Sequence, residues 1–219
     1  MTIFTRNTIA RGAGFVATGL CALALSALGA CSALRPAAAT PPAFYTLDSQ
    51  PDRAPRPALV DVQRTRPTLI ITPPRAAAGF DSQRIIFVRT DHQLEYFSHS
   101  EWVDPPARML GPLLASAIEQ TGAFAAVVLT PASAAGDQRL DTEIVRLQHN
   151  FQTHPSRVQF TLRAYLMDDR TRRVLAWHEF SDEVEAASET PQGGVAAANQ
   201  AVHNVLGKLA QSVATGTRW

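Results

Sequence analysis

The histidines and one pair of aspartates are the side chains whose types and spacing could do chemistry. Of the six histidines, the closest two, His149 and His154, flank an expected turn, whereas a metalloprotease zinc site places two histidines four apart on a helix. Acid–base catalysis by Asp168 and Asp169 would need converging carboxylates, but adjacent turn residues point apart. Nucleophile-elbow, P-loop and dinucleotide-binding motifs are absent from the sequence. We therefore expect solvated polar residues here, no metal site, no cofactor and no enzyme.

One thiol has a defined chemistry, that of Cys31. Arg6 and Arg11 form a basic start, residues 14–28 form an apolar stretch, and Leu28-Gly29-Ala30-Cys31 closes it with small residues before the thiol. This pattern is typical of a bacterial lipoprotein signal. It predicts a signal peptide over residues 1–30, diacylglycerol on the sulfur of Cys31, cleavage before that residue, and acylation, such as palmitate, of the new amine. The alternative is a retained signal anchor, because the uncharged run is long enough to span a bilayer.

Composition limits what the mature chain can bind. The whole chain has 20 Lys plus Arg against 19 Asp plus Glu, so loss of the two leader arginines leaves a net charge of −1. This balance predicts neither nucleic-acid binding nor electrostatic attachment to anionic lipid. Two or more acyl chains suffice for stable anchoring. With Ser32 after the cysteine, lipoprotein sorting favours the inner leaflet of the outer membrane, with the domain in the periplasm.

Prolines and alanines divide the mature chain into a tether and a domain. Residues 31–57 are rich in both residue types and are expected to form a lipidated tether. The short alternating segment Phe44-Tyr45-Thr46-Leu47 within it is either an apolar spot in the linker or a strand that docks on the domain. Residues 58–219 are expected to form a single domain.

Hydrophobic periodicity predicts the elements of that domain. Strands are expected at residues 66–72, 84–89, 93–97, 125–129, 140–151, 157–167 and 173–184, the last three as an antiparallel meander. One helix is expected from an Asp104 cap to Gly122, either kinked at Pro112 or starting near Leu110. A second begins with Thr190-Pro191 and ends near Val213. These elements predict an α+β fold, with an antiparallel or mixed sheet of about five to seven strands and two main helices on one face.

Aromatic residues supply the candidate contacts for a partner. Aromatic side chains concentrate at protein interfaces. The alternative for each is packing in the core, which is the favoured interpretation for Phe97 and Trp102. The candidate partner-binding residues lie in two groups along the chain: Phe44, Tyr45, Ile85, Tyr96, Phe97 and Trp102.

Three segments resemble a known family. Gly79-Phe80-Asp81-Ser82-Gln83-Arg84-Ile85-Ile86, then Leu94-Glu95-Tyr96, then Ser100-Glu101-Trp102 followed by Pro105 and a leucine-rich helix resemble the ABC-type transport auxiliary lipoproteins. The early Tyr45-Thr46-Leu47 is similar to the Tyr-x-Leu that follows the lipobox in that family. These are the PqiC-type partners of transporters with mammalian-cell-entry (MCE) domains.

The resemblance implies an auxiliary, non-enzymatic component of a machine that moves lipids between the inner and outer membranes. The implied partners are periplasmic MCE subunits of an ABC transporter, and their ring shape is compatible with a homo-oligomer. We expect the hairpin from Ile85 to Phe97, with Trp102, to form the docking face. An alternative function is regulation of a cell-wall synthase or other envelope assembly, and a hydrolase would need a nucleophile that the sequence does not reveal.

Overall fold

The computed structural model describes residues 41–48, 66–131 and 135–216. Cys31 and the expected signal peptide lie outside these residues. The described elements are a mixed sheet of nine strands and two helices, in the order β1 (Ala43–Tyr45), β2 (Thr68–Ile71), β3 (Arg75–Ala76), β4 (Arg84–Val88), β5 (Glu95–Trp102), α2 (Pro106–Glu119), β6 (Ala126–Leu129), β7 (Gln138–Asn150), β8 (Arg157–Asp168), β9 (Val174–Glu185) and α3 (Pro191–Thr215). The predicted α+β class with two helices is confirmed, with more strands than expected.

Three long strands form the expected meander. β7 pairs antiparallel with β8 over its whole length, and β8 pairs antiparallel with β9. Side chains of β8 alternate between buried and partly exposed, as the period-two pattern of its sequence predicts. The buried set, Val158, Phe160, Leu162, Ala164 and Leu166, faces the helices. The sheet therefore has one covered face and one open face in this region.

The second edge of β7 carries three short strands in succession. β2 pairs with residues 138–140, β3 with residues 143–144 and β4 with residues 149–150, all parallel to β7. β6 then pairs with β2, and β5 pairs antiparallel with β4. β7 is thus the common partner of most of the sheet, and its carboxyl end is where β4 and β5 are attached.

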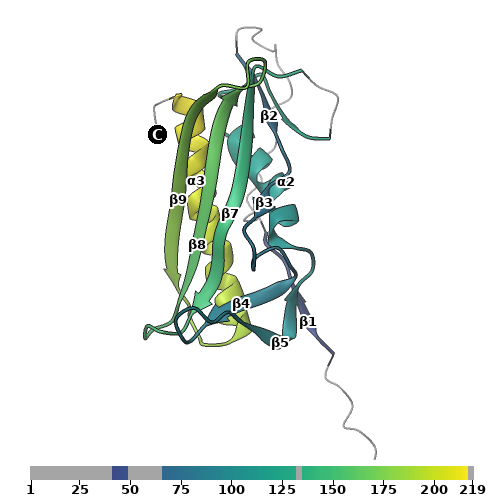
Figure 1. Cartoon of the computed structure of the whole chain (residues 1–219). Helices are drawn as coiled ribbons and strands as arrows, with labels where there is room; N and C mark the ends of the chain where they lie inside the picture. Colours follow the sequence, from purple (N-terminus) through teal and green to yellow (C-terminus); the bar gives the residue numbers. More distant parts are fainter. Residues whose placement is uncertain (1–40, 49–65, 132–134, 217–219) are drawn as a thin grey trace, which may run out of the picture. The chain divides into compact units, whose positions relative to one another are not determined.

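Both helices lie on the covered face of the sheet (Figure 1). α3 runs along the meander, and α2 packs on α3 and β6. Leu206 and Leu209 of α3 are at most 5% exposed, and Leu110 and Leu114 of α2 are fully buried. Burial of such side chains contributes roughly 1.5 to 3 kcal/mol each, so this contact between the sheet and the helices is the main core.

The helix ends follow the local sequence with one correction. Thr190 caps α3, as predicted, by accepting a hydrogen bond from the Gly193 N–H at 3.2 Å. α2 does not begin at Asp104: Pro105 occupies the cap position in an extended conformation and Pro106 is the first helical residue. A residue that precedes a proline is disfavoured in the helical region, so the second proline moves the start by one residue. α2 continues through Pro112, which is exposed, and no separate first turn forms.

The short aromatic segment in the expected tether belongs to the domain. β1 pairs with β5 through Tyr45 and Trp102, and Leu47 is 6% exposed within the core. The Asp48 N–H also donates to Oδ1 of Asn199 on α3 at 2.7 Å. The domain therefore starts near residue 42, not at residue 58, because this segment pairs with a distant strand and buries Leu47 in the core.

Helices able to cross a bilayer are not found among the described residues.

Candidate functional site

The predicted partner-binding residues divide into surface and core. Phe44 is 60% exposed and Tyr96 is 50% exposed, whereas Ile85 and Trp102 are only 4% and 3% exposed. Tyr45 is partly buried in β1. The expectation that Ile85 and Trp102 offer contacts to a partner is therefore wrong: both side chains point into the main core. Trp102 is also held through its backbone N–H, which donates to the Gln83 carbonyl at 2.7 Å.

Exposed apolar side chains gather on β1, β5 and their flanks. Of the large apolar residues found exposed in the described part of the chain, four lie here and form what we call the β1–β5 surface: Phe44, Leu94, Tyr96 and Val103. The Val103 N–H donates to the Tyr45 carbonyl at 2.8 Å, which fixes the two strands beside each other. The guanidinium of Arg84 lies 4.1 Å from the centre of the Tyr96 ring. This surface combines apolar contacts with one cation, as protein interfaces do.

A second exposed apolar group lies at the start of β9. Trp177 is 58% exposed and its ring stacks with Tyr165 at 6.3 Å between centroids. Val174 and Leu175 are also exposed. The residues pair with the part of β8 that meets the amino end of β7, so this group lies at the opposite end of the meander from β4 and β5.

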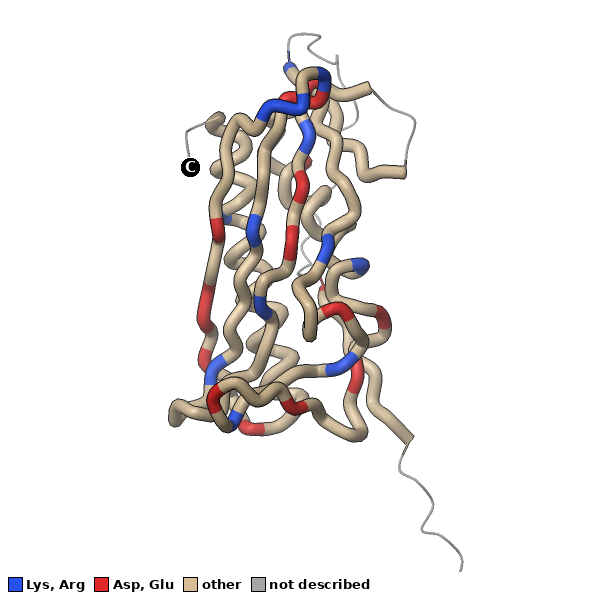
Figure 2. The backbone as a smooth tube through the Cα atoms, viewed as in Figure 1, with Lys and Arg blue, Asp and Glu red and all other residues tan. Residues whose placement is uncertain are grey.

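Charged residues of both signs occur on neighbouring strands of the meander (Figure 2). Arg163 bridges Glu143 and Glu179, with N–O distances of 3.1 and 2.6 Å. Its hydrogen bond to Glu179 raises the pKa of Arg163 above the ordinary value. Because the charge of Arg163 is balanced by carboxylates on both neighbouring strands, these three residues stabilise the ladder.

The two adjacent aspartates serve different structural partners. Asp168 accepts hydrogen bonds from the N–H and hydroxyl of Thr171, at 2.6 and 2.8 Å, and these bonds lower the pKa of Asp168. Asp169 instead accepts from Nε of Arg139 at 2.7 Å. One carboxylate closes the β8–β9 turn and the other ties it to β7, which matches the expectation that they do not work as a pair.

His149 and His154 have different environments. His154 is exposed, as expected, and its Nδ1 lies 3.1 Å from Oε1 of Glu189. His149 is 2% exposed, so the expectation of a solvated residue was wrong. Its Nε2 lies 2.9 Å from Oγ of Ser156, and its Nδ1 has no hydrogen-bond partner among the described residues. Burial lowers the pKa of His149 below 6.5, which favours the neutral ring.

The structure also shows an aromatic cluster that was not predicted from the sequence. The rings of Phe87 and Phe97 lie 4.6 Å apart, and Phe151 lies 5.5 Å from Phe87. The ring of His149 lies 4.2 Å from that of Phe151. Phe97 was a candidate contact, but its neighbours come from β4 and the end of β7. The sequence feature that could have indicated this cluster is Phe151, an apolar residue directly after the last residue of the alternating strand β7, Asn150.

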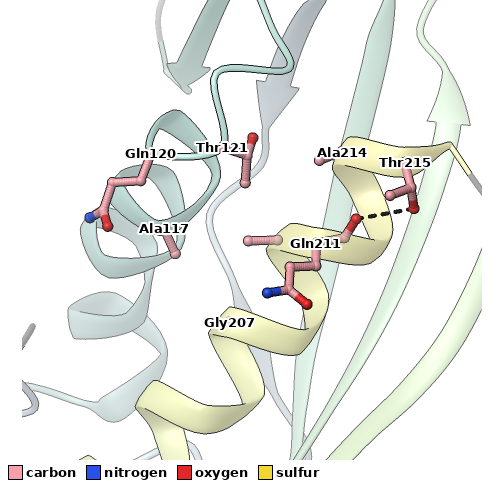
Figure 3. A pocket seen from close by; sticks show the side chains of 8 residues that line it. Ala117, Gln120, Thr121, Gly207, Gln211, Ala214 and Thr215 are labelled. Carbon is pink, nitrogen blue, oxygen red and sulfur yellow. Dashed lines mark hydrogen bonds between the residues drawn. The ribbon is translucent and has the colours of Figure 1, made fainter. Parts of the chain in front are cut away.

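A groove between the helices offers a different kind of surface. It has a volume of about 490 Å3 and lies between the ends of α2 and α3 (Figure 3). Its lining consists of small and uncharged polar residues: Ala117, Gln120, Thr121, Gly207, Ala210, Gln211, Ala214 and Thr215. None of these side chains ionises, so the lining offers no general acid or base, and its two threonine hydroxyls have no base within the lining to activate them. Among the described residues no cluster of His, Cys, Asp and Glu suits a metal ion either.

Solved structures share this α+β architecture. Protein XCC0632 from Xanthomonas campestris, described as DUF330, is 23% identical, with a TM-score of 0.66 over 81% of this chain and 96% of that chain. A crystal structure described only as an uncharacterized protein is 11% identical, with a TM-score of 0.61 over 80% of this chain and 99% of that chain. At these identities the likeness concerns the fold alone. No curated protein matches the chain.

The fold is therefore that of a bacterial α+β domain already known from crystals. A family model narrows the class: the model described as the ABC-type transport auxiliary lipoprotein component matches residues 45–210. The match covers most of the chain, and the protein belongs to this family. It is thus an auxiliary lipoprotein component of ABC-type transport, a class whose members are anchored in the cell envelope.

Proposed function

We propose that this protein is a non-enzymatic auxiliary component of an MCE-type ABC transporter that moves lipids between the inner and outer membranes. Family membership carries the proposal, because the match runs from Tyr45 in β1 to Ala210 in α3. The surfaces described above support it: they offer apolar contacts and balanced charges, which suit binding rather than bond making.

The anchor of this component is proposed to be the lipid on Cys31, in the inner leaflet of the outer membrane. Two or more acyl chains give stable attachment without help from the protein surface. Because β1 starts at Ala43, the residues between the anchor and the sheet are few, and a segment of this size reaches at most about 40 Å. A tether of this length keeps the domain close to the bilayer and raises its effective concentration for a partner there.

The proposed docking site for an MCE subunit is the β1–β5 surface. Tyr96 remains from the docking face expected from the sequence and Phe44 from the other candidate contacts, since both are at least half exposed. Leu94 and Val103 extend it on either side, at 48% and 49% exposure. Such an apolar group on a folded monomer is typical of an interaction site.

Co-purification tests the proposal directly. The full-length lipoprotein, isolated from detergent-solubilised cells, is expected to bring with it MCE subunits identified by mass spectrometry. The double variant Phe44→Ser with Tyr96→Ser is expected to lose most of that recovery. Trp177→Ser is the matched control, because Trp177 is as exposed but lies at the other end of the meander. Circular dichroism of both variants checks that the fold is retained.

Two results would each reject one part of the proposal. Recovery of a penicillin-binding protein in place of MCE subunits would favour the alternative, regulation of cell-wall synthesis. Equal recovery of MCE subunits with the double variant and the control would leave the transporter assignment standing but remove the β1–β5 surface as the docking site.

A further inference from the structure

Three phenylalanines from separate parts of the sheet line one pocket. Phe87 on β4, Phe97 on β5 and Phe151 after β7 pack within 4.6 to 6.4 Å of one another, measured between ring centroids. They border a pocket of about 420 Å3 whose remaining lining is Arg89, His154 and Glu189. This size and a largely aromatic wall with a few polar groups are typical of small-molecule sites.

Charges of both signs stand around the pocket. Arg89 lies with its guanidinium 4.9 Å from the centre of the Phe87 ring, and Nε and Nη2 donate to Glu95. Its Nη1 donates no hydrogen bond to another described residue, and the side chain is 62% exposed. Glu189 lies beside His154, and these two side chains are 55% and 78% exposed. The polar groups can therefore reach a ligand at the pocket mouth.

Residues packed behind Phe151 hold the aromatic wall of the pocket in place. The ring of His149 lies 4.2 Å from that of Phe151, and its bond to Ser156 holds the imidazole in place. Gly194 of α3 closes the other side of His149, where even an added Cβ would lie 2.5 Å from Nδ1. Phe87 itself is 7% exposed. The aromatic wall is thus preformed, which lowers the entropic cost of binding an apolar ligand.

We propose that this pocket binds one acyl chain of a zwitterionic phospholipid. The pocket, with a volume of about 420 Å3 and three phenylalanine rings in its wall, is large and apolar enough to take up part of an acyl chain. The phosphate of the head group would meet the free Nη1 of Arg89, and its ammonium would meet Glu189. The presence of both charges at one mouth favours a zwitterionic head group over a purely anionic ligand. This inference rests on the proposed function in lipid transport and assigns the domain a direct contact with the transported class of molecule.

Photo-crosslinking in cells tests the pocket. The full-length protein carrying Phe97→p-benzoylphenylalanine is irradiated in cells grown with 32P-phosphate, then purified under denaturing conditions and analysed for covalently bound phospholipid. The control carries the same photoreactive residue at Trp177, which is more exposed but distant from the pocket. We expect about tenfold more label at position 97 than at position 177, since a pocket that encloses its ligand retains it beside the probe. Adding Phe151→Asp is expected to abolish most of the label at position 97.

The alternatives give distinct outcomes. Equal label at positions 97 and 177 would mean contact with the nearby bilayer only, and absence of label at position 97 would mean an empty pocket; either overturns the proposal. A crosslinked protein at position 97 without 32P would show that a partner side chain fills the pocket and would also overturn it. Because co-purification of MCE subunits is measured separately, a failed crosslink with intact co-purification rejects the pocket alone. A phospholipid crosslink at position 97 without co-purification of MCE subunits rejects the transporter assignment and retains the pocket.

Discussion

Two glycines of α3 are expected to respond oppositely to the same substitution. A Cβ added at Gly207 would meet no heavy atom within 4 Å, whereas one added at Gly194 would lie 2.5 Å from Nδ1 of His149 and 3.2 and 3.3 Å from two further ring atoms. Both residues lie within the helix, which runs from Pro191 to Thr215. Gly207→Ala and Gly194→Ala therefore form a matched pair in which only the surroundings of the new methyl group differ.

The expected magnitudes follow from this geometry. Glycine inside a helix costs about 0.5 to 1 kcal/mol relative to alanine, so Gly207→Ala is expected to stabilise the domain by that amount. At Gly194 the imidazole would have to move by nearly 1 Å to restore an ordinary contact, but Ser156 and Phe151 hold it. Overpacking of this kind costs about 1 to 3 kcal/mol. The clash exceeds the helix-propensity gain, and Gly194→Ala is expected to destabilise the domain.

Urea unfolding followed by circular dichroism at the helix band measures both effects. The two variants are expected to differ by about 1 to 3 kcal/mol in the free energy of unfolding, because the helix-propensity gain is common to both, and thus by several degrees in Tm for a chain of this size. His149→Ala in the Gly194→Ala background is expected to recover part of the loss, because the ring that clashes is gone. If Gly194→Ala proved as stable as Gly207→Ala, the packing of α3 against His149 described above would be incorrect.

Two further substitutions test the pH dependence of stability that His149 causes and the burial of Leu206 in the core. Burial holds the pKa of His149 below 6.5 in the folded state, so the unfolded chain binds more protons in acid, and the stability contributed by the neutral ring is present above about pH 6.5 and lost as the pH falls through the folded pKa. The free energy of unfolding is expected to fall between pH 7 and pH 5, and His149→Gln should make that slope shallower; an unchanged slope would contradict the assignment. Leu206→Asp places a carboxylate at a site that is 5% exposed and is expected to remove most of the net stability, typically about 5 to 15 kcal/mol; a cooperative unfolding transition like that of the unchanged protein would show that α3 is not part of the core.

Features written in short stretches of sequence were predicted well. The Thr190-Pro191 start of α3, its apolar stripe and the alternation of β8 all depend on residues within a few positions of one another. The β7–β8–β9 meander likewise needs only short turns between neighbouring strands. Such local patterns fix an element because backbone geometry and side-chain periodicity act together within it.

Pairings between distant segments were not predictable in the same way. β3 has only two residues and gains its identity from Glu143 and Ile144 of β7. The sequence left open whether residues 44–47 form an apolar spot in a linker or a strand that docks on the domain. Only the pairing of β1 with β5 decided for the strand. Parallel pairings leave no turn signature, because the paired strands are separated by long stretches of chain.

The candidate contacts show the same division. Residue type placed Tyr96, Phe97 and Trp102 in one group, but Tyr96 is half exposed and Trp102 is buried. Strict alternation would put Tyr96 and Trp102 on the same face, and the register shift between β4 and β5 is what separates them. No local pattern connects Phe87, Phe97 and Phe151, which meet only because β4 and β5 attach at the carboxyl end of β7. An aromatic side chain suits both a core and an interface, so its sequence neighbours do not decide between them.

The amino-acid sequence alone gave correct predictions for the start of α3 at Thr190-Pro191, the amphipathic periods and the family. Lipid attachment at Cys31 stays a prediction from the sequence. Tertiary structure alone decided which aromatic residues face solvent, that β1 joins the sheet, and that three phenylalanines enclose one pocket. The physical reason is the sequence distance over which each kind of interaction acts. Propensities, caps and signal motifs act over a few residues, whereas burial depends on which distant strand the long strand β7 brings alongside.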